Sequence, residues 1–451
     1  MAITLHFINW NYNLIHFLLA FEELPVPHDG ENIAAACMEA FKRFGIQNSM
    51  SGGVFDNASN NANAVSILLR SNIIKMEELL HNRCSCHILN LIVQEGLSLL
   101  KDELQTLRSL CGQIRTPKQM DTFLHFVKKQ FGDETPTHKY SPFPAKDCLT
   151  RWNSTYNMIK TSLPYRTVLN KVCDATQPIN EDEWCVMSAM KDILEPFEET
   201  TLTLSAVEKV TLHEVYPEVM GIMSHINQQF EKCEETETNS DLHHCVAGMS
   251  EKFNKYWLNV PEAALVANVL DPTMKLEYLN MKNSADARKA ETTLKDWYVR
   301  YYMPLSDAQA ESSTTSIASN NKRKKHAELA KAIYSPVRHS EVHIYLDEPL
   351  ESDLTEPLDY WKRNQYRFPA LAQMARDILA IPASSVPSES VFSQSGRVLD
   401  DYRSNLHPST VAALMLSESW MDAFEKYHWK RPNIKISMRQ KEVEEIVIND
   451  E

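Results

Sequence analysis

The sequence lacks several features that would assign it to a specialised class of protein. No run of 18 or more apolar residues occurs, so no segment is expected to span a membrane. Residues 1–7 carry neither a basic stretch nor a small-residue cleavage site, so we expect no signal peptide. Glycine is scarce, with 10 in 451 residues, and this favours a helix-rich fold. The nine cysteines, an odd number scattered from Cys37 to Cys245, favour a reducing compartment over a disulfide framework.

An excess of positive charge is also missing, because the formal net charge is −14. Phosphate binding needs clustered Lys and Arg, so this charge argues against a chain that coats nucleic acid by itself. A local basic groove, or DNA contact by a dimer, remains compatible with it. The length of 451 residues allows two or three lobes, and 43% apolar with 24% charged residues is ordinary for a globular chain.

The first 70 residues have the pattern of a mixed α/β unit. Alternating apolar residues predict a strand over residues 2–9, and residues 9–13 and 14–21 read as a turn and a return strand. Helical spacing follows from Gly30 to Gly45, then a short strand ends near Phe55, and a helix carries Val65 and Leu68. This order fits a ribonuclease-H-like core, and it fits several other folds as well.

The region from Tyr360 to Trp420 predicts three packed helices. Apolar residues at helical spacing end before Pro382, which stops the first helix. Ser385 can cap a second helix that Gly396 closes, and a third helix begins near Pro408. Glu389 lies in the first turn of the second helix, where exposed N–H groups favour a negative charge. On this pattern alone Glu389 is equally well explained as a capping residue.

The amino-acid sequence of this region resembles the C-terminal dimerisation region of hAT-family transposases, especially the plant type with an N-terminal BED finger. The matching segments are residues 360–361 (Tyr-Trp), 368–372 (Phe-Pro-Ala-Leu-Ala), 380–385 (Ala-Ile-Pro-Ala-Ser-Ser), 388–393 (Ser-Glu-Ser-Val-Phe-Ser) and 403–406 (Arg-Ser-Asn-Leu). The resemblance implies a homodimer or higher assembly, with Leu371, Met374, Ile378, Val411, Leu414 and Met415 as apolar dimerisation residues. It also implies that Glu389 is the last acid of a catalytic triad.

Residues 55–61 (Phe-Asp-Asn-Ala-Ser-Asn-Asn) resemble a second element of that family. The resemblance implies that Asp56 ends a core strand and is the second catalytic acid. Clustered carboxylates need a divalent ion to neutralise them, so Asp56 and Glu389 would bind Mg²⁺ or Mn²⁺ in an active enzyme. Without the resemblance, an aspartate at this place is more often a helix cap.

The family's first catalytic aspartate, on an Asp-x-Trp strand, has no counterpart here. No Asp or Glu precedes Glu22, and no BED zinc finger is present. We therefore expect an α/β fold with a large all-α insertion, a ribonuclease-H-like core interrupted by a helical domain, whose first core strand is missing. The triad would be incomplete.

Two further segments allow a functional and a structural interpretation. Residues 151–156 (Arg-Trp-Asn-Ser-Thr-Tyr) resemble the start of the family's helical insertion, which implies that Arg151 and Trp152 contact DNA, with the indole stacking on an exposed base. The alternative is a core tryptophan beside a surface arginine. Cys84, Cys86 and His87 could suggest zinc, but no second ligand pair completes a site, so buried structural residues are favoured.

The predicted division is residues 1–150 for a partial core, 151–305 for the helical insertion, 306–340 for a flexible linker, 341–421 for the dimerisation region that completes the core, and 422–451 for a loose tail. Residues 194–200 and 270–276 resemble further landmarks of the insertion. The basic cluster at residues 322–325 (Lys-Arg-Lys-Lys) favours a nuclear location.

Two functions follow from these observations. The first is a transposase-derived interaction protein that dimerises, contacts DNA and does not cut it. The second is a metal-dependent DNA transposase that uses Asp56 and Glu389 with a third ligand still to be identified.

Overall fold

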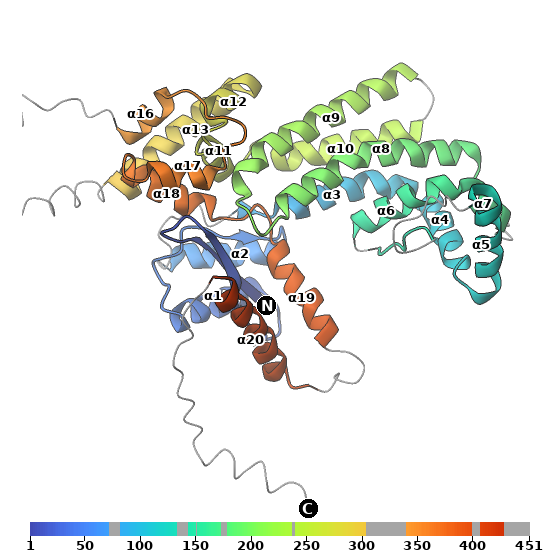
Figure 1. Cartoon of the computed structure of the whole chain (residues 1–451), viewed down its shortest axis with the longest axis horizontal. Coiled ribbons are helices and arrows are strands. Elements are labelled where there is room, and N and C mark those ends of the chain that lie inside the picture. Colours follow the sequence, from blue (N-terminus) through green and yellow to red (C-terminus); the bar gives the residue numbers. More distant parts are fainter. Residues whose placement is uncertain are drawn as a thin grey trace, which may run out of the picture.

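The computed structural model describes residues 1–71, 82–132, 143–149, 151–172, 178–236, 240–303, 340–398 and 406–427. Figure 1 shows two connected parts: a long array of helices, and a smaller unit that contains the N-terminal strands. The predicted linker and its basic cluster, and most of the predicted tail, lie outside the described residues. No helix in the described ranges is long and apolar enough to cross a membrane.

The smaller unit begins with the predicted hairpin. Strands β1 (Ala2–Ile8) and β2 (Leu14–Phe21) pair antiparallel, with an irregularity between Ile3 and Thr4. Helices α1 (Gly30–Arg43) and α2 (Ser59–Arg70) pack together around a separate small core. Gly30 is required there, because a Cβ on it would lie 2.7 Å from Asn63. Between these helices lies β3 (Val54–Phe55), which pairs in parallel with β4 (Asn82–Arg83). The predicted order of strands and helices is confirmed.

The helical array carries most of the core. Its members are α3 (Ser85–Leu97), α4 (Lys101–Gln113), α5 (Pro117–Phe131), α6 (Trp152–Ser162), α7 (Arg166–Val172), α8 (Glu181–Leu204), α9 (Val215–Thr236), α10 (Ser240–Trp257), α11 (Glu262–Val269), α12 (Lys275–Lys282) and α13 (Ser284–Trp297). Helix α3 packs against α8 and α10, so helices on both sides of the boundary predicted at residue 150 share one core.

The C-terminal helices are divided between the two parts (Figure 1). Helices α16 (Glu341–Asp347), α17 (Pro357–Asn364) and α18 (Pro369–Leu379) belong to the main core of the array. Helices α19 (Val386–Val398) and α20 (Pro408–Lys426) pack against β1 and β2. The helix starts after Ser385 and near Pro408 agree with prediction. The predicted end of the second helix at Gly396 is wrong, since α19 continues to Val398.

In the described ranges the strands form two separate two-stranded sheets, and the structure is otherwise mostly helical. Helix α20 covers the free edge of β2 with side chains. The backbone N–H of Leu18 donates to Ser419 Oγ at 2.9 Å, and Trp420 Nε1 donates to the Leu18 carbonyl at 2.7 Å. An edge strand left open would expose these groups for pairing with another chain. The C-terminal region therefore stabilises the N-terminal hairpin.

Candidate functional site

Asp56 directly follows β3, at the point where the chain turns into α2. Its carboxylate oxygen Oδ1 accepts the backbone N–H of Ala58 at 2.9 Å and the side-chain amide of Asn61 at 2.6 Å. These bonds fix the start of α2, as expected of an aspartate before a helix. The side chain is exposed to solvent. The neighbouring Asn57 has a side-chain amide that is buried and without a partner among the described residues. Asp56 thus has a structural role and still faces solvent.

Cys84 joins Asp56's strand to the start of α19. The backbone N–H of Cys84 donates to the Phe55 carbonyl at 2.9 Å. Its sulfur accepts the backbone N–H of Ser385 at 3.3 Å, although the two residues are 301 positions apart. Ser385 Oγ in turn donates to Glu389 Oε1 at 2.8 Å. Two acidic segments far apart in the sequence therefore converge on one buried cysteine.

Burial and a nearby negative charge keep the two cysteine thiols at this junction protonated. Burial raises the pKa of the Cys84 thiol, and it raises that of Cys86 to about 12. The negative charge of Glu389 acts in the same direction on both groups. Both thiols are therefore protonated at neutral pH, whereas metal binding and nucleophilic attack need a thiolate. Cys84 and Cys86 are buried, as predicted, and His87 is partly buried.

Arg151 approaches the same helix from the array. Its guanidinium Nη2 donates to Ser393 Oγ on α19 at 3.3 Å, one turn after Glu389, and its side chain is exposed. Trp152 is 2% exposed and its ring packs against Tyr156. The ring is not available to stack on a DNA base in this conformation, and the stacking role of Trp152 stays a prediction. The alternative, a core tryptophan beside a surface arginine, describes the structure.

The start of α6 is held by a buried acid that the sequence analysis did not identify. Asp147 accepts hydrogen bonds from Ser154 at 2.7 Å and Thr155 at 2.9 Å, and it pairs with Arg108 at 2.5 Å. Burial alone would raise the pKa of this carboxyl, but the three donors hold it below its usual value. Asp147 thereby fixes the helix that presents Arg151.

A divalent ion would need more ligands than this junction supplies. Mg²⁺ and Mn²⁺ prefer several oxygen ligands, and Asp56 and Glu389 contribute two carboxylates. In the described residues, no group of three or more His, Cys, Asp or Glu is arranged to hold a metal ion. The unpartnered amide of Asn57 adds one neutral oxygen. The donor set of this chain therefore does not by itself fit the metal pair that the resemblance implies.

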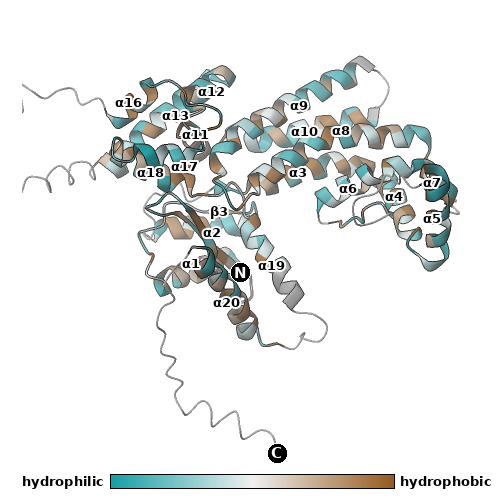
Figure 2. Cartoon of the chain, viewed as in Figure 1, coloured by the Kyte–Doolittle hydropathy of each residue, from teal (hydrophilic) through white to brown (hydrophobic). Residues whose placement is uncertain are grey.

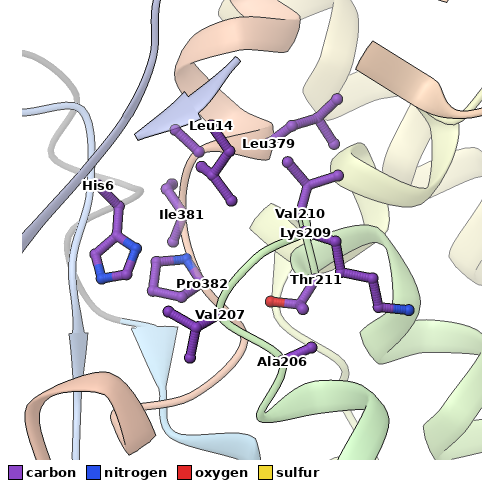
Figure 3. Close-up of a pocket in the computed structure, with 11 residues that line it drawn as sticks. His6, Leu14, Ala206, Val207, Lys209, Val210, Thr211, Leu379, Ile381 and Pro382 are labelled. Atoms are coloured by element: carbon purple, nitrogen blue, oxygen red, sulfur yellow. The ribbon is translucent and has the colours of Figure 1, made fainter. Parts of the chain in front are cut away.

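A small cavity lies where the hairpin meets the connection between α18 and α19 (Figure 3). Its volume is about 10 Å³, and Leu14, Val207, Ile381 and Pro382 contribute much of its lining. That is at the lower limit for holding one water molecule. The cavity is a packing defect between the two parts and has no room for a ligand.

A larger groove of about 310 Å³ lies between the hairpin and helices α19 and α20. His16 Nε2 lies 3.3 Å from Glu208 Oε1, and Lys426 also pairs with Glu208. The rings of His6 and His16 stack with centroids 5.9 Å apart. These polar residues come from three distant segments, and no local pattern in the sequence marks them. They could therefore not be predicted from the sequence.

Most of the predicted dimerisation residues are not available on the surface of the chain. Leu371, Met374 and Ile378 are fully buried in the main core, and Val411 and Met415 pack with Leu18 and Val391. These five side chains are covered within the same chain, on the apolar face of α18 and on the side of α20 that carries Val411 and Met415. Leu414 is the exception, with 45% of its surface exposed.

Four sequence-family models match separate parts of the chain. They are described as a ZBED1 RNase-like domain (residues 1–84), a ZBED1 RNase-like helical domain (82–193), an hAT-like transposase RNase-H fold (213–302) and an hAT family C-terminal dimerisation region (341–421). The last range equals the one predicted from the sequence. Residues 213–302 are helical here, while the strands lie in the first 83 residues.

Several curated proteins resemble the chain over almost its whole length. It is 28% identical to a putative AC transposase of Zea mays, over 94% of this chain and 55% of that protein. It is 26% identical to the zinc finger BED domain-containing protein RICESLEEPER 2 of Oryza sativa subsp. japonica, over 92% of this chain and 62% of the relative. For DAYSLEEPER of Arabidopsis thaliana the identity is 25%, over 93% and 61%. The chain thus spans little more than half the length of these relatives.

Proposed function

Since this chain is related to the hAT-family transposases and carries their C-terminal dimerisation region, we propose that it self-associates, contacts DNA and does not itself cut DNA. The ribonuclease-H-like core interrupted by helices is part of the same proposal. So is a location in the nucleus, where DNA-contacting relatives would act.

The observation that carries the proposal is an apolar face left uncovered on α20. Leu414 and Met421 are seven residues apart, so they lie on one side of the helix, and they are 45% and 52% exposed. Ser417 and the exposed acid Glu418 lie between them along the helix, one on each side of the line that joins the two apolar residues. Both apolar residues fall within the matched dimerisation region. Burying such a stripe against a second copy would contribute about 25 cal/mol per Å² before the costs of association.

Light scattering on the purified full chain at micromolar concentration tests the proposal. The expected mass is that of two or more copies, against 51.8 kDa for one. A chain that stays monomeric across this range contradicts self-association.

A second candidate is DNA cutting, and the convergence of Asp56 and Glu389 on Cys84 favours it. In this hypothesis the two carboxylates are ligands for Mg²⁺ or Mn²⁺ and other groups complete the site. The test is incubation of the chain with supercoiled plasmid DNA and either ion. Nicking by the wild type that is lost in Asp56→Asn and in Glu389→Gln would favour this candidate over the first.

A further inference from the structure

Positive charge is concentrated in one part of this acidic chain. Residues 101–172 contain twelve Lys and Arg against six Asp and Glu, a formal charge of +6. Because the whole chain carries −14, the remaining residues carry −20. The segment comprises α4 to α7, and Figure 1 shows these helices at one end of the array, away from α12 and α16. We call this part the basic lobe.

The lobe is a folded unit that holds its surface in a fixed arrangement. Helices α5 and α7 pack together, and the Phe123 and Tyr165 rings lie 5.6 Å apart in its interior. Arg115 donates hydrogen bonds to the carbonyls of Cys111 and Pro144, which ties α4 to the segment that precedes α6. Arg108 pairs with the buried carboxylate of Asp147. These two arginines are therefore structural, and they leave the outer surface to other cations.

The outer surface carries exposed lysines. They have no hydrogen-bond or ion-pair partner among the described residues and comprise Lys118, Lys128, Lys129, Lys146 and Lys171. On α5, Lys118, His125 and Lys129 follow helical spacing on the side opposite the buried Phe123 and Val127. Figure 2 shows hydrophilic colour on the outer sides of α5 and α7. Asp121 is an acid on the same side of α5.

The second helix extends this surface. Thr167 Oγ1 donates to Gln130 at 2.8 Å, which places the exposed side of α7 against the end of α5. Lys171 lies one turn beyond Thr167 on the same side of α7. From Lys118 to Lys129 the helix rises roughly 16 Å, about the length of five base-pair steps in duplex DNA. The lysines at the two ends of this stretch are thus far enough apart to contact phosphates about five base pairs apart.

We propose that the basic lobe binds the phosphate backbone of duplex DNA through Lys118, Lys128, Lys129 and Lys171. The inference deepens the proposed DNA contact and depends on it. An acidic protein surface fits less well, because the cores of protein interfaces are depleted in lysine and rely on aromatic and arginine anchors. The chain's remaining negative charge does not prevent binding, since screening acts beyond about 8 Å at physiological salt.

The test compares two triple variants of the full chain that change the net charge equally. The lobe variant is Lys128→Gln/Lys129→Gln/Lys171→Gln, and the control is Lys42→Gln/Lys282→Gln/Lys362→Gln, whose lysines are exposed elsewhere. Binding to a fluorescein-labelled 24-base-pair duplex of arbitrary sequence is measured by anisotropy between 50 and 200 mM salt. We expect the lobe variant to bind at least about tenfold more weakly, with the slope of log K against log salt reduced by roughly 2 to 3. The control should bind like the wild type.

The outcomes separate this inference from the proposed function. If the wild type does not bind duplex DNA at 50 mM salt, both the DNA contact and the role of the lobe are overturned. If the wild type binds and the two variants lose affinity equally, or neither does, the lobe assignment fails and the DNA contact stands. If poly-L-glutamate displaces the duplex as well as an equal charge of unlabelled DNA does, the surface does not distinguish DNA from other polyanions and the assignment to DNA is overturned. Thermal unfolding by circular dichroism checks that both variants are folded.

Discussion

At the scale of single residues, Lys275 connects the helical array to the dimerisation region. Its side chain is 1% exposed, and Nζ donates to the carbonyls of Tyr345 at 2.7 Å, Glu348 at 2.9 Å and Pro349 at 3.3 Å. Burial lowers the pKa of this amine. One buried cation thus satisfies three carbonyls at and after the end of α16. The resemblance of residues 270–276 to a family landmark gave no hint of this role.

Lys275→Met keeps the aliphatic chain and removes the donor. We expect it to lower the free energy of unfolding by about 3 kcal/mol, because three carbonyls would lose their buried partner. Urea denaturation measures the change. Lys282→Met, at an exposed position, is the matched control, and its free energy of unfolding should stay within about 0.5 kcal/mol of the wild-type value. A loss below about 1 kcal/mol for Lys275→Met would show that the carbonyls find other partners.

At the scale of elements, the contact between α20 and β2 determines whether the hairpin is stable. Trp420→Phe removes the indole N–H that donates to the Leu18 carbonyl and keeps an aromatic ring near Phe17 and Phe44. We expect a loss of about 1–3 kcal/mol in unfolding free energy, since the carbonyl on the strand edge loses its partner. Hydrogen exchange of β2 amides measures the effect locally. Unchanged protection there would contradict a role for α20 in covering the edge.

The hairpin should also make stability depend on pH. Burial, and then the neighbouring His16, lower the pKa of His6 from 6.5 to about 4. Between pH 6.5 and about 4, His6 binds a proton in the unfolded chain and stays neutral in the folded hairpin. The stabilisation is therefore complete above pH 6.5 and is lost as the pH falls toward 4. His16 acts in the same direction, because burial and Lys426 lower its pKa while Glu208 opposes them.

His6→Gln removes this titration. We expect the unfolding free energy of the variant to fall less between pH 7 and 5 than that of the wild type, in urea titrations at matched salt. His28→Gln, at an exposed position, should keep the wild-type dependence. If His6→Gln also keeps the full dependence, the proton uptake belongs to other groups.

The sequence predicted these elements where the signal is local. Alternation of Ile3, Leu5 and Phe7 was enough for β1, and Pro382 correctly ended α18. It did not predict which apolar faces are covered. Leu371 and Leu414 have the same chemistry, but one is in the core and the other is half exposed, and the difference depends on contacts with distant segments. The bond from Ser385 to Cys84, across 301 residues, is likewise a property of the folded chain.

At the scale of the whole molecule, the C-terminal region holds the two parts together. Helices α16 to α18 belong to the array, while α19 and α20 pack on the hairpin, and the junction contains Asp56, Arg151 and Glu389. The resemblance implied one metal site for Asp56 and Glu389, and hydrogen bonds at Cys84 and Ser393 link their segments to each other and to Arg151. Trp152 is buried in the core, where its ring packs against Tyr156 of the same helix.

Self-association through the exposed side of α20 is tested most directly by sedimentation equilibrium of matched double variants. We predict that the wild type sediments as a dimer or larger assembly, and that Leu414→Asp/Met421→Asp shifts it to the 51.8 kDa monomer. Val26→Asp/Leu258→Asp changes exposed apolar residues outside the dimerisation region, and it should sediment like the wild type. A monomeric wild type, or an assembly that the α20 variant leaves intact, would contradict the account.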